Sequence, residues 1–241
     1  MSNQNDNLVL IVGESGTGKT ASLRNITDPT GVMYFNCESG KKLSFPAKFQ
    51  QYTITDPLQI YEGFIHAETK ADIHTIIIDS LTFLMDMFES VHVIGSTNTM
   101  AQWQAYAQFF KNLMQQYVAP STKNVIFTAH TQSIMNDIDM VLSRQVPIKG
   151  ALKGVGIESF FSLVVATKTI ETSKLKDYKN NLLNVTTEED SIGMKYVYQT
   201  KLTKETVHDR IRAPMGMFTL EQTFIDNDIQ TIIDILHKYY T

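Results

Sequence analysis

The chain has 241 residues, of which 43% are hydrophobic and 19% are charged, a composition typical of a globular protein with one large α/β domain. Its formal net charge of −4 argues against a protein that coats nucleic acid non-specifically, so any nucleic-acid contact must be local. A single cysteine, Cys37, excludes an intramolecular disulfide and is typical of a reducing cytoplasm. Residues 1–7 do not form a signal peptide, and no apolar run reaches the roughly 20 residues of a membrane helix. We therefore expect a cytoplasmic protein with no membrane partner.

Apolar, β-branched runs alternate with helical patterns along the chain, which predicts an α/β fold. Strands are predicted at 8–12, 31–37, 75–79, 124–129, 162–167 and 196–202, with further strand signals at 207–211 and 218–220. Helices are predicted at 57–70, 101–118 and 226–239, and another begins at Lys19. This order predicts a single domain over 1–241, with a mostly parallel sheet flanked by helices and antiparallel strands at one edge.

Two segments interrupt this alternation. Residues 133–150 have no clear hydrophobic period and few charges, so we expect a long mobile loop. Residues 171–195 are polar, which predicts an excursion with a turn between two strands.

A phosphate-binding pattern, GxxxxGK[ST], follows the first predicted strand. Its residues are Gly13, Glu14, Ser15, Gly16, Thr17, Gly18, Lys19 and Thr20, and Ala21 comes next. Glycines let backbone N–H groups converge on phosphates, Lys19 can reach the β and γ phosphates, and Thr20 offers a hydroxyl to Mg²⁺. Such a match arises by chance in about one chain in a hundred of this length. The sequence therefore predicts an ATP and Mg²⁺ site, and the remaining alternative is an ATP binder that does not hydrolyse.

Two acidic residues at strand ends are candidates to complete this site. The apolar strand 75–79 ends in Asp79, the Walker B pattern, and carboxyl ends of parallel strands meet at one edge of a sheet. We expect Asp79 to support Mg²⁺, the alternative being an Asp that caps the next helix. Hydrolysis also needs a group that orients water, and Glu38, at the end of the strand 31–37, is our candidate base. The alternative is a solvent-facing turn residue before Gly40.

Four segments, in this order, resemble the RecA-like ATPase core, and in particular its short phage members associated with single-strand annealing and recombination. They are 13–20, Asn36-Cys37-Glu38, Ile76-Ile77-Ile78-Asp79-Ser80 and Val125-Ile126-Phe127-Thr128-Ala129-His130-Thr131-Gln132. In that family a polar residue at the end of the fourth segment senses the γ-phosphate and opens a mobile DNA-binding loop. The resemblance gives the sensor role to His130 and implies that 133–150 contacts DNA.

The segment Arg210-Ile211-Arg212-Ala213-Pro214 resembles the family's basic hairpin, whose basic residue reaches the ATP of a neighbouring subunit. The resemblance therefore implies that Arg210 acts in trans in an oligomer, where a cation stabilises charge on the transferred phosphoryl group. The alternative is a pair of solvated arginines on an edge strand.

The resemblance also implies action on single-stranded DNA in phage recombination, annealing or repair, in a bacterial host cytoplasm. The residues support this partner less strongly, because Arg144 and Lys149 in 133–150 are offset by Asp137 and Asp139. Three other functions stay open. They are an oligomeric motor or loader acting on a protein partner, a nucleotide switch without turnover, and, last, a small-molecule kinase.

Overall fold

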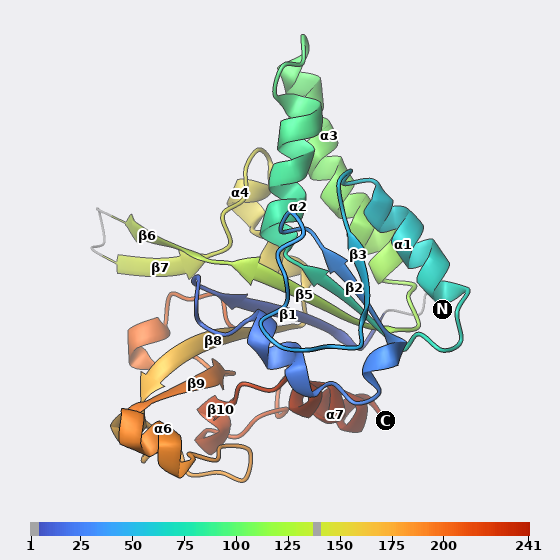
Figure 1. Ribbon diagram of the computed structural model, residues 1–241. Coiled ribbons are helices and arrows are strands. Elements are labelled where there is room, and N and C mark those ends of the chain that lie inside the picture. The colour runs from blue at the N-terminus through green and yellow to red at the C-terminus, as the bar shows by residue number, and fades with distance from the viewer. Residues whose placement is uncertain (1–4, 137–140) are drawn as a thin grey trace.

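The computed structural model describes residues 5–136 and 141–241, which are built around an eight-stranded sheet of order β10-β9-β8-β1-β5-β4-β2-β3 (Figure 1). The strands are β1 (Leu8–Gly13), β2 (Val32–Asn36), β3 (Gln50–Thr53), β4 (Thr75–Asp79), β5 (Asn124–His130), β8 (Leu163–Glu171), β9 (Met194–Gln199) and β10 (Phe224–Asp226). From β8 to β3 all neighbours are parallel, and β9 and β10 add antiparallel pairs at one edge. The predicted α/β P-loop NTPase fold with antiparallel edge strands is confirmed.

Helices cover both faces of the sheet (Figure 1). The α-helices are α1 (Gln59–Glu68), α2 (Leu81–Phe88), α3 (Thr99–Asn112), α4 (Leu152–Val155), α5 (Thr172–Leu175), α6 (Thr187–Ile192) and α7 (Ile229–Tyr240). Short 3-10 helices span Thr20–Asn25, Pro29–Gly31, Ile157–Phe160, Lys204–Thr206 and Glu221–Thr223, and π-helical turns span Glu89–Val93 and Leu113–Val118. No described helix is long and apolar enough to cross a membrane.

The core lies in two layers because successive strand residues point to opposite faces of the sheet. Leu10 and Val12 of β1 pack in the layer of α1, α2 and α3, whereas Val9 and Ile11 pack in the layer of α7. Since both faces are covered, the central strands are mainly apolar on both faces rather than alternating. This is why their positions could be predicted, and β4 coincides with its predicted range.

Two strand predictions near the C-terminus are wrong. Residues 207–211 and 218–220 form no strand, and an isolated bridge from Val164 to Arg212 is the pairing found there. The cause is tertiary. The apolar side chain of Val207 faces solvent, whereas the charged side chain of Asp209 is buried beside Arg144 and Lys168. The alternation of apolar and polar residues in the sequence therefore does not correspond to a strand with one buried face.

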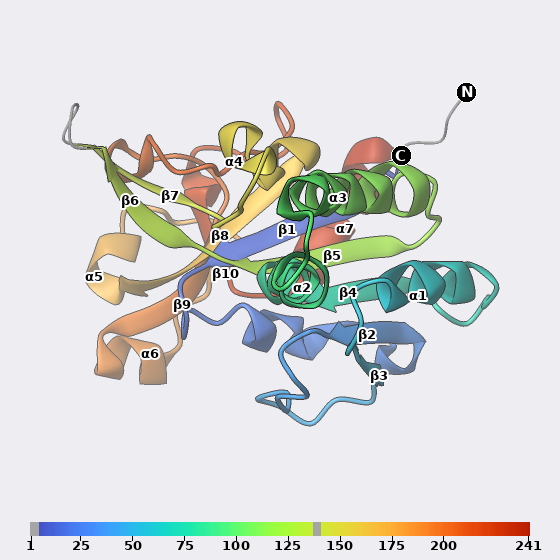
Figure 2. The ribbon, with the colours of Figure 1, turned by 90° about the horizontal axis from the view of Figure 1, so that it is seen from above.

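The segment 133–150 is also not a structureless loop. It contributes to a two-stranded antiparallel sheet, β6 (Gln132–Asn136) and β7 (Val141–Gln145), in which Ser133 lies opposite Arg144. This hairpin extends away from the main sheet (Figures 1 and 2). The part of the predicted loop at 137–140, with Asp137 and Asp139, lies outside the described residues. The strands were missed because residues with both faces partly exposed carry no clear hydrophobic period, and the mobility of the segment stays a prediction.

The segment between β8 and β9 leaves the sheet and returns to it. It contains α5 and α6, and β8 and β9 then pair antiparallel along their length. The helix α6 begins with a capping box, in which Thr186 and Glu189 satisfy each other's backbone N–H groups.

Candidate functional site

The glycine-rich segment predicted to bind phosphate is the turn from β1 into the 3-10 helix Thr20–Asn25. Gly16 and Gly18 have φ of 79° and 94°, in the left-handed region that favours glycine. At Gly13 a Cβ would lie 2.1 Å from Thr167 Oγ1, so a side chain at this position has no room. The backbone conformation and the lack of space therefore explain why these positions are glycine. With glycine there, the loop can curl so that its N–H groups face inward.

A cavity of about 510 Å³ opens over this loop. Side chains from the carboxyl ends of β2, β4 and β5 reach it beside the loop itself. Residues predicted from the sequence that line the cavity include Gly16, Lys19, Thr20, Glu38, Asp79 and His130. The volume lies in the range of small-molecule sites.

The amino group of Lys19 folds back onto its own loop. Lys19 Nζ donates to the carbonyl oxygens of Gly13 at 2.9 Å and Glu14 at 2.8 Å, and lies 3.4 Å from His130 Nδ1. Lys19 is only 6% exposed, and this burial lowers the pKa of the lysine to about 8. The site thus holds a desolvated cation that is hydrogen-bonded to neutral carbonyl groups. Phosphate oxygens can replace these carbonyls as the partners of the cation.

The carboxylate of Asp79 is buried and accepts three hydrogen bonds. Thr20 Oγ1 donates to Asp79 Oδ2 at 2.9 Å, Tyr34 OH donates to the same oxygen at 2.6 Å, and Thr128 Oγ1 donates to Oδ1. Burial and the neighbouring Asp79 raise the pKa of Tyr34, so the phenol stays protonated and donates. Tyr34 and Thr128 were missed from the sequence. The available signal was a polar residue inside each apolar strand, β2 and β5, that flanks β4.

The donor set at Asp79 fits Mg²⁺. The hydroxyl of Thr20 and the carboxylate of Asp79 are hard oxygen ligands 2.9 Å apart at the loop. In residues 5–136 and 141–241 no group of three or more His, Cys, Asp or Glu side chains could hold a metal by itself. Mg²⁺ is commonly held by one or two protein oxygens together with substrate phosphates and water, so this small set suffices.

Glu38 lies at the end of β2, where its carboxylate contacts two bases. Its Oε1 is 3.2 Å from His130 Nε2 and its Oε2 is 2.9 Å from Lys41 Nζ. The hydrogen bond from His130 is the main reason that the pKa of Glu38 falls to about 2. Glu38 is therefore ionised at neutral pH, and its carboxylate can accept hydrogen bonds. The imidazole of His130 contacts both Glu38 and Lys19, so three predicted site residues meet in one chain of contacts.

A phosphate loop, a buried Asp at the end of β4 and an ionised Glu thus converge on one cavity. A family model described as an AAA domain matches residues 5–206. The chain belongs to this AAA-domain family. It is therefore a P-loop ATPase-type domain, and ATP binding and hydrolysis are the general activity of such a domain. No curated protein matches the sequence.

In this AAA domain Arg210 does not line the cavity at Lys19. Its Nη1 donates to Glu158 Oε2 at 3.0 Å, and its side chain is 34% exposed. Arg210 instead lines a second cavity of about 860 Å³, which borders Gly13, Glu14 and Thr17 from the side of β8. The structure thus separates Arg210 from the cavity at Lys19 of its own chain.

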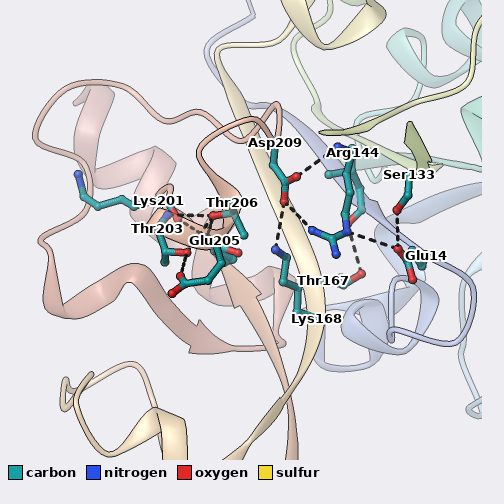
Figure 3. A network of polar contacts seen from close by, with 12 residues as sticks. Glu14, Ser133, Arg144, Thr167, Lys168, Lys201, Thr203, Glu205, Thr206 and Asp209 are labelled. Carbon is teal, nitrogen blue, oxygen red and sulfur yellow. Dashed lines mark hydrogen bonds and ion pairs between the residues drawn. The ribbon is translucent and has the colours of Figure 1, made fainter. Parts of the chain in front are cut away.

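A network of ion pairs links this second cavity to the hairpin (Figure 3). Asp209 accepts from the backbone N–H of Arg144 at 3.2 Å and lies 3.5 Å from its Nη1 and 3.2 Å from Lys168 Nζ. Arg144 Nε also lies 3.4 Å from Glu14 Oε1, to which Ser133 Oγ donates at 3.3 Å. The base of the hairpin is therefore tied both to the phosphate loop and to the segment after β9.

This network predicts a stability effect. Changing Asp209 to Asn is expected to lower the free energy of unfolding by about 1–3 kcal/mol, because two cations lose a buried charged partner. Urea denaturation of both proteins measures the difference. The matched control is Glu205→Gln, an exposed acid in the same segment, which should leave stability near wild type. Equal effects of the two substitutions would contradict the assigned role of Asp209.

Proposed function

We propose that this AAA domain hydrolyses Mg²⁺-bound ATP, with Glu38 as the base that orients the attacking water. The observation that carries the proposal is the contact chain from Lys19 through His130 to Glu38, with steps of 3.4 Å and 3.2 Å. A lysine for the phosphates and an ionised carboxylate for water are thereby joined by one imidazole.

Each residue has a distinct part in this proposal. Lys19 leaves the carbonyls of its loop and binds the β and γ phosphates, while Thr20 and Asp79 provide oxygen ligands for Mg²⁺. Bound Mg²⁺ supplies neutralisation of charge on the phosphate oxygens. His130 exchanges its contact with Lys19 for the γ-phosphate, which makes it the sensor. Glu38 is ionised before the step and accepts a proton from the attacking water, whose oxygen bonds to the γ-phosphorus as the bond to the β–γ bridging oxygen breaks and ADP leaves.

The lowered pKa of Lys19 gives a pH dependence. Below about pH 8 the lysine is protonated in the free protein, and bound phosphates raise its pKa, so binding above that pH requires uptake of a proton. We therefore expect ATP affinity to fall above about pH 8, by up to about tenfold per pH unit. Calorimetric titrations in buffers of different ionisation enthalpy measure both the affinity and the proton uptake. An affinity that stays constant well above this pH, without proton uptake, would contradict the assignment.

We further propose that Arg210 acts on the ATP of a neighbouring copy, which requires an oligomer. Its exclusion from its own nucleotide cavity and its partly exposed guanidinium support this role. Only one of its N–H groups is bound to Glu158, and a guanidinium has five donors. Activity that rises more than linearly with protein concentration, and is lost in Arg210→Ala without loss of ATP binding, is the expected result.

Single-stranded DNA is our proposed partner, with the hairpin β6–β7 as its contact, in phage recombination, annealing or repair. The extended shape of the hairpin supports it, as does its link through Arg144 to the phosphate loop. One observation favours a second candidate, an ATPase acting on a protein partner. Arg144 and Lys149 are already paired with acids of their own chain, Lys149 Nζ lying 2.5 Å from Glu89 Oε2, which leaves less charge for phosphates.

ATP hydrolysis with and without single-stranded DNA tests these proposals, with Lys19→Ala as the blank. If DNA raises the ATP turnover of the wild-type chain several-fold and leaves Lys19→Ala without turnover, the DNA-directed function is supported. Turnover that is indifferent to DNA favours the protein-directed ATPase. ATP binding without hydrolysis would exclude Glu38 as a working base and leave a nucleotide switch.

A further inference from the structure

The nucleotide cavity extends to both sides of β1 in the sheet. Glu38, Asp79 and His130 reach it from β2, β4 and β5, whereas Tyr196 reaches it from β9 and Asn227 from the residues after β10. β1 lies between these two groups of strands. The loop that follows β1 therefore has the proposed catalytic residues on one side and, on a second side, Tyr196 and Asn227. A single ligand in this cavity can therefore contact both sides of the loop.

Tyr196 presents an aromatic ring at this second side. A Cβ on Gly18 would lie 3.3 Å from Tyr196 Cδ1, so the ring lies directly against the phosphate loop. Tyr196 shares one face of β9 with Tyr198, which is fully buried in the layer of α7, yet Tyr196 is 51% exposed. A half-exposed ring beside a phosphate loop offers a surface on which a nucleobase can stack.

Asn227 supplies a buried acceptor that no described residue pairs with. Its Nδ2 donates to the carbonyl oxygen of Gly18 at 3.0 Å, which fixes the orientation of the amide. Its Oδ1 is buried and has no hydrogen-bond partner among the described residues, although Asn227 is only 4% exposed and lines the cavity. Buried acceptors are nearly always paired, so this one calls for a donor from outside the chain.

We propose that the nucleoside of a bound nucleotide stacks on Tyr196 and donates a hydrogen bond to Asn227 Oδ1. This inference rests on the proposed function, because it places the nucleoside whose phosphates the loop holds. Both groups reach the loop at Gly18, one residue before Lys19, so a single ligand can contact the loop and this subsite together. The donor is either the exocyclic amino group of adenine or a ribose hydroxyl.

Equilibrium binding of ATP and of inorganic tripolyphosphate, each with Mg²⁺, tests the stacking role. Tyr196→Ala should weaken ATP by about tenfold and leave tripolyphosphate unchanged, whereas Tyr196→Phe keeps the ring and should bind ATP as wild type does. Met194→Ala is the matched control, since Met194 is 40% exposed on the same face of β9 but does not line the cavity. Unchanged ATP affinity in Tyr196→Ala, or equal weakening of both ligands, would overturn the stacking role.

Three ATP analogues test the acceptor in the wild-type chain. Inosine triphosphate lacks the exocyclic amino group, and 2′-deoxy-ATP and 3′-deoxy-ATP each lack one ribose hydroxyl, so one of the three should bind less tightly than ATP. If all three bind as tightly as ATP, Asn227 Oδ1 is not the partner of a nucleoside donor.

The same titrations separate this proposal from the proposed function. If tripolyphosphate binds the wild-type chain as tightly as ATP, the nucleoside subsite is wrong and the phosphate site stands. If neither ligand binds, the proposed function fails and the subsite with it.

Discussion

Replacing Glu38 with Gln is expected to lower kcat for ATP hydrolysis by about 10²–10⁴-fold while ATP still binds. An amide has almost the size of the carboxylate and can still accept the hydrogen bond from His130, 3.2 Å away, but it cannot accept a proton from water. Steady-state phosphate release and ATP titration of the same preparation give kcat and affinity separately.

The control for this substitution is Glu14→Gln. Glu14 belongs to the phosphate loop itself, yet its side chain is 53% exposed and points to Arg144 and Ser133 rather than into the nucleotide cavity. Its amide variant should keep a kcat close to that of wild type. A Glu38→Gln variant that hydrolyses ATP at the wild-type rate would show that another group orients the water.

Lys41 also contacts Glu38, so its substitution provides a second comparison for Glu38→Gln. Its ammonium lies 2.9 Å from Glu38 Oε2, and the side chain is 70% exposed. Because water screens the charge of so exposed an ammonium, Lys41→Ala should change kcat far less than Glu38→Gln does. The large effect is thus expected of the carboxylate, and its neighbour serves mainly to position it.

The sheet could be predicted largely because its central strands are buried on both faces. Residues 76–78 are three consecutive isoleucines, all fully buried, and such a run has few alternatives to an interior strand. β3 was missed for the opposite reason. It lies at the sheet edge, three of its four residues are exposed, and its sequence Gln-Gln-Tyr-Thr carries no apolar alternation. Its place depends on pairing with β2, which a local pattern does not contain.

The residues of the candidate site likewise divide into those that a local sequence pattern reveals and those that it does not. The phosphate loop could be found because its function needs particular residues at fixed spacing along the chain. Tyr34 and Thr128 could not, since each acts through Asp79 of a neighbouring strand. Tyr196 and Asn227 reach Gly18 from 178 and 209 residues further along the chain, differences given by their numbers. The sequence thus predicted side chains that gather at the cavity and missed those that contact them from neighbouring strands.

Replacing Lys19 with Ala is expected to weaken ATP binding by about 10–100-fold and to reduce hydrolysis to background. The ammonium is the cation nearest the loop carbonyls of Gly13 and Glu14, and no neutral group at this position can balance the charge of the phosphates. Thermal unfolding with and without Mg²⁺ and ATP measures the loss directly, because a ligand raises the unfolding temperature only if it binds the folded chain.

The matched substitution is Lys42→Ala. Lys42 also lines the nucleotide cavity but is exposed, so its charge is screened by water and its loss should leave the thermal shift nearly intact. If both variants lose the shift equally, the cavity attracts ATP by its overall charge. If Lys19→Ala alone loses it, while its unfolding without ligand remains cooperative, the effect belongs to the buried lysine. Its desolvation, already visible in the lowered pKa, is then the source of the strength of its contact with phosphate.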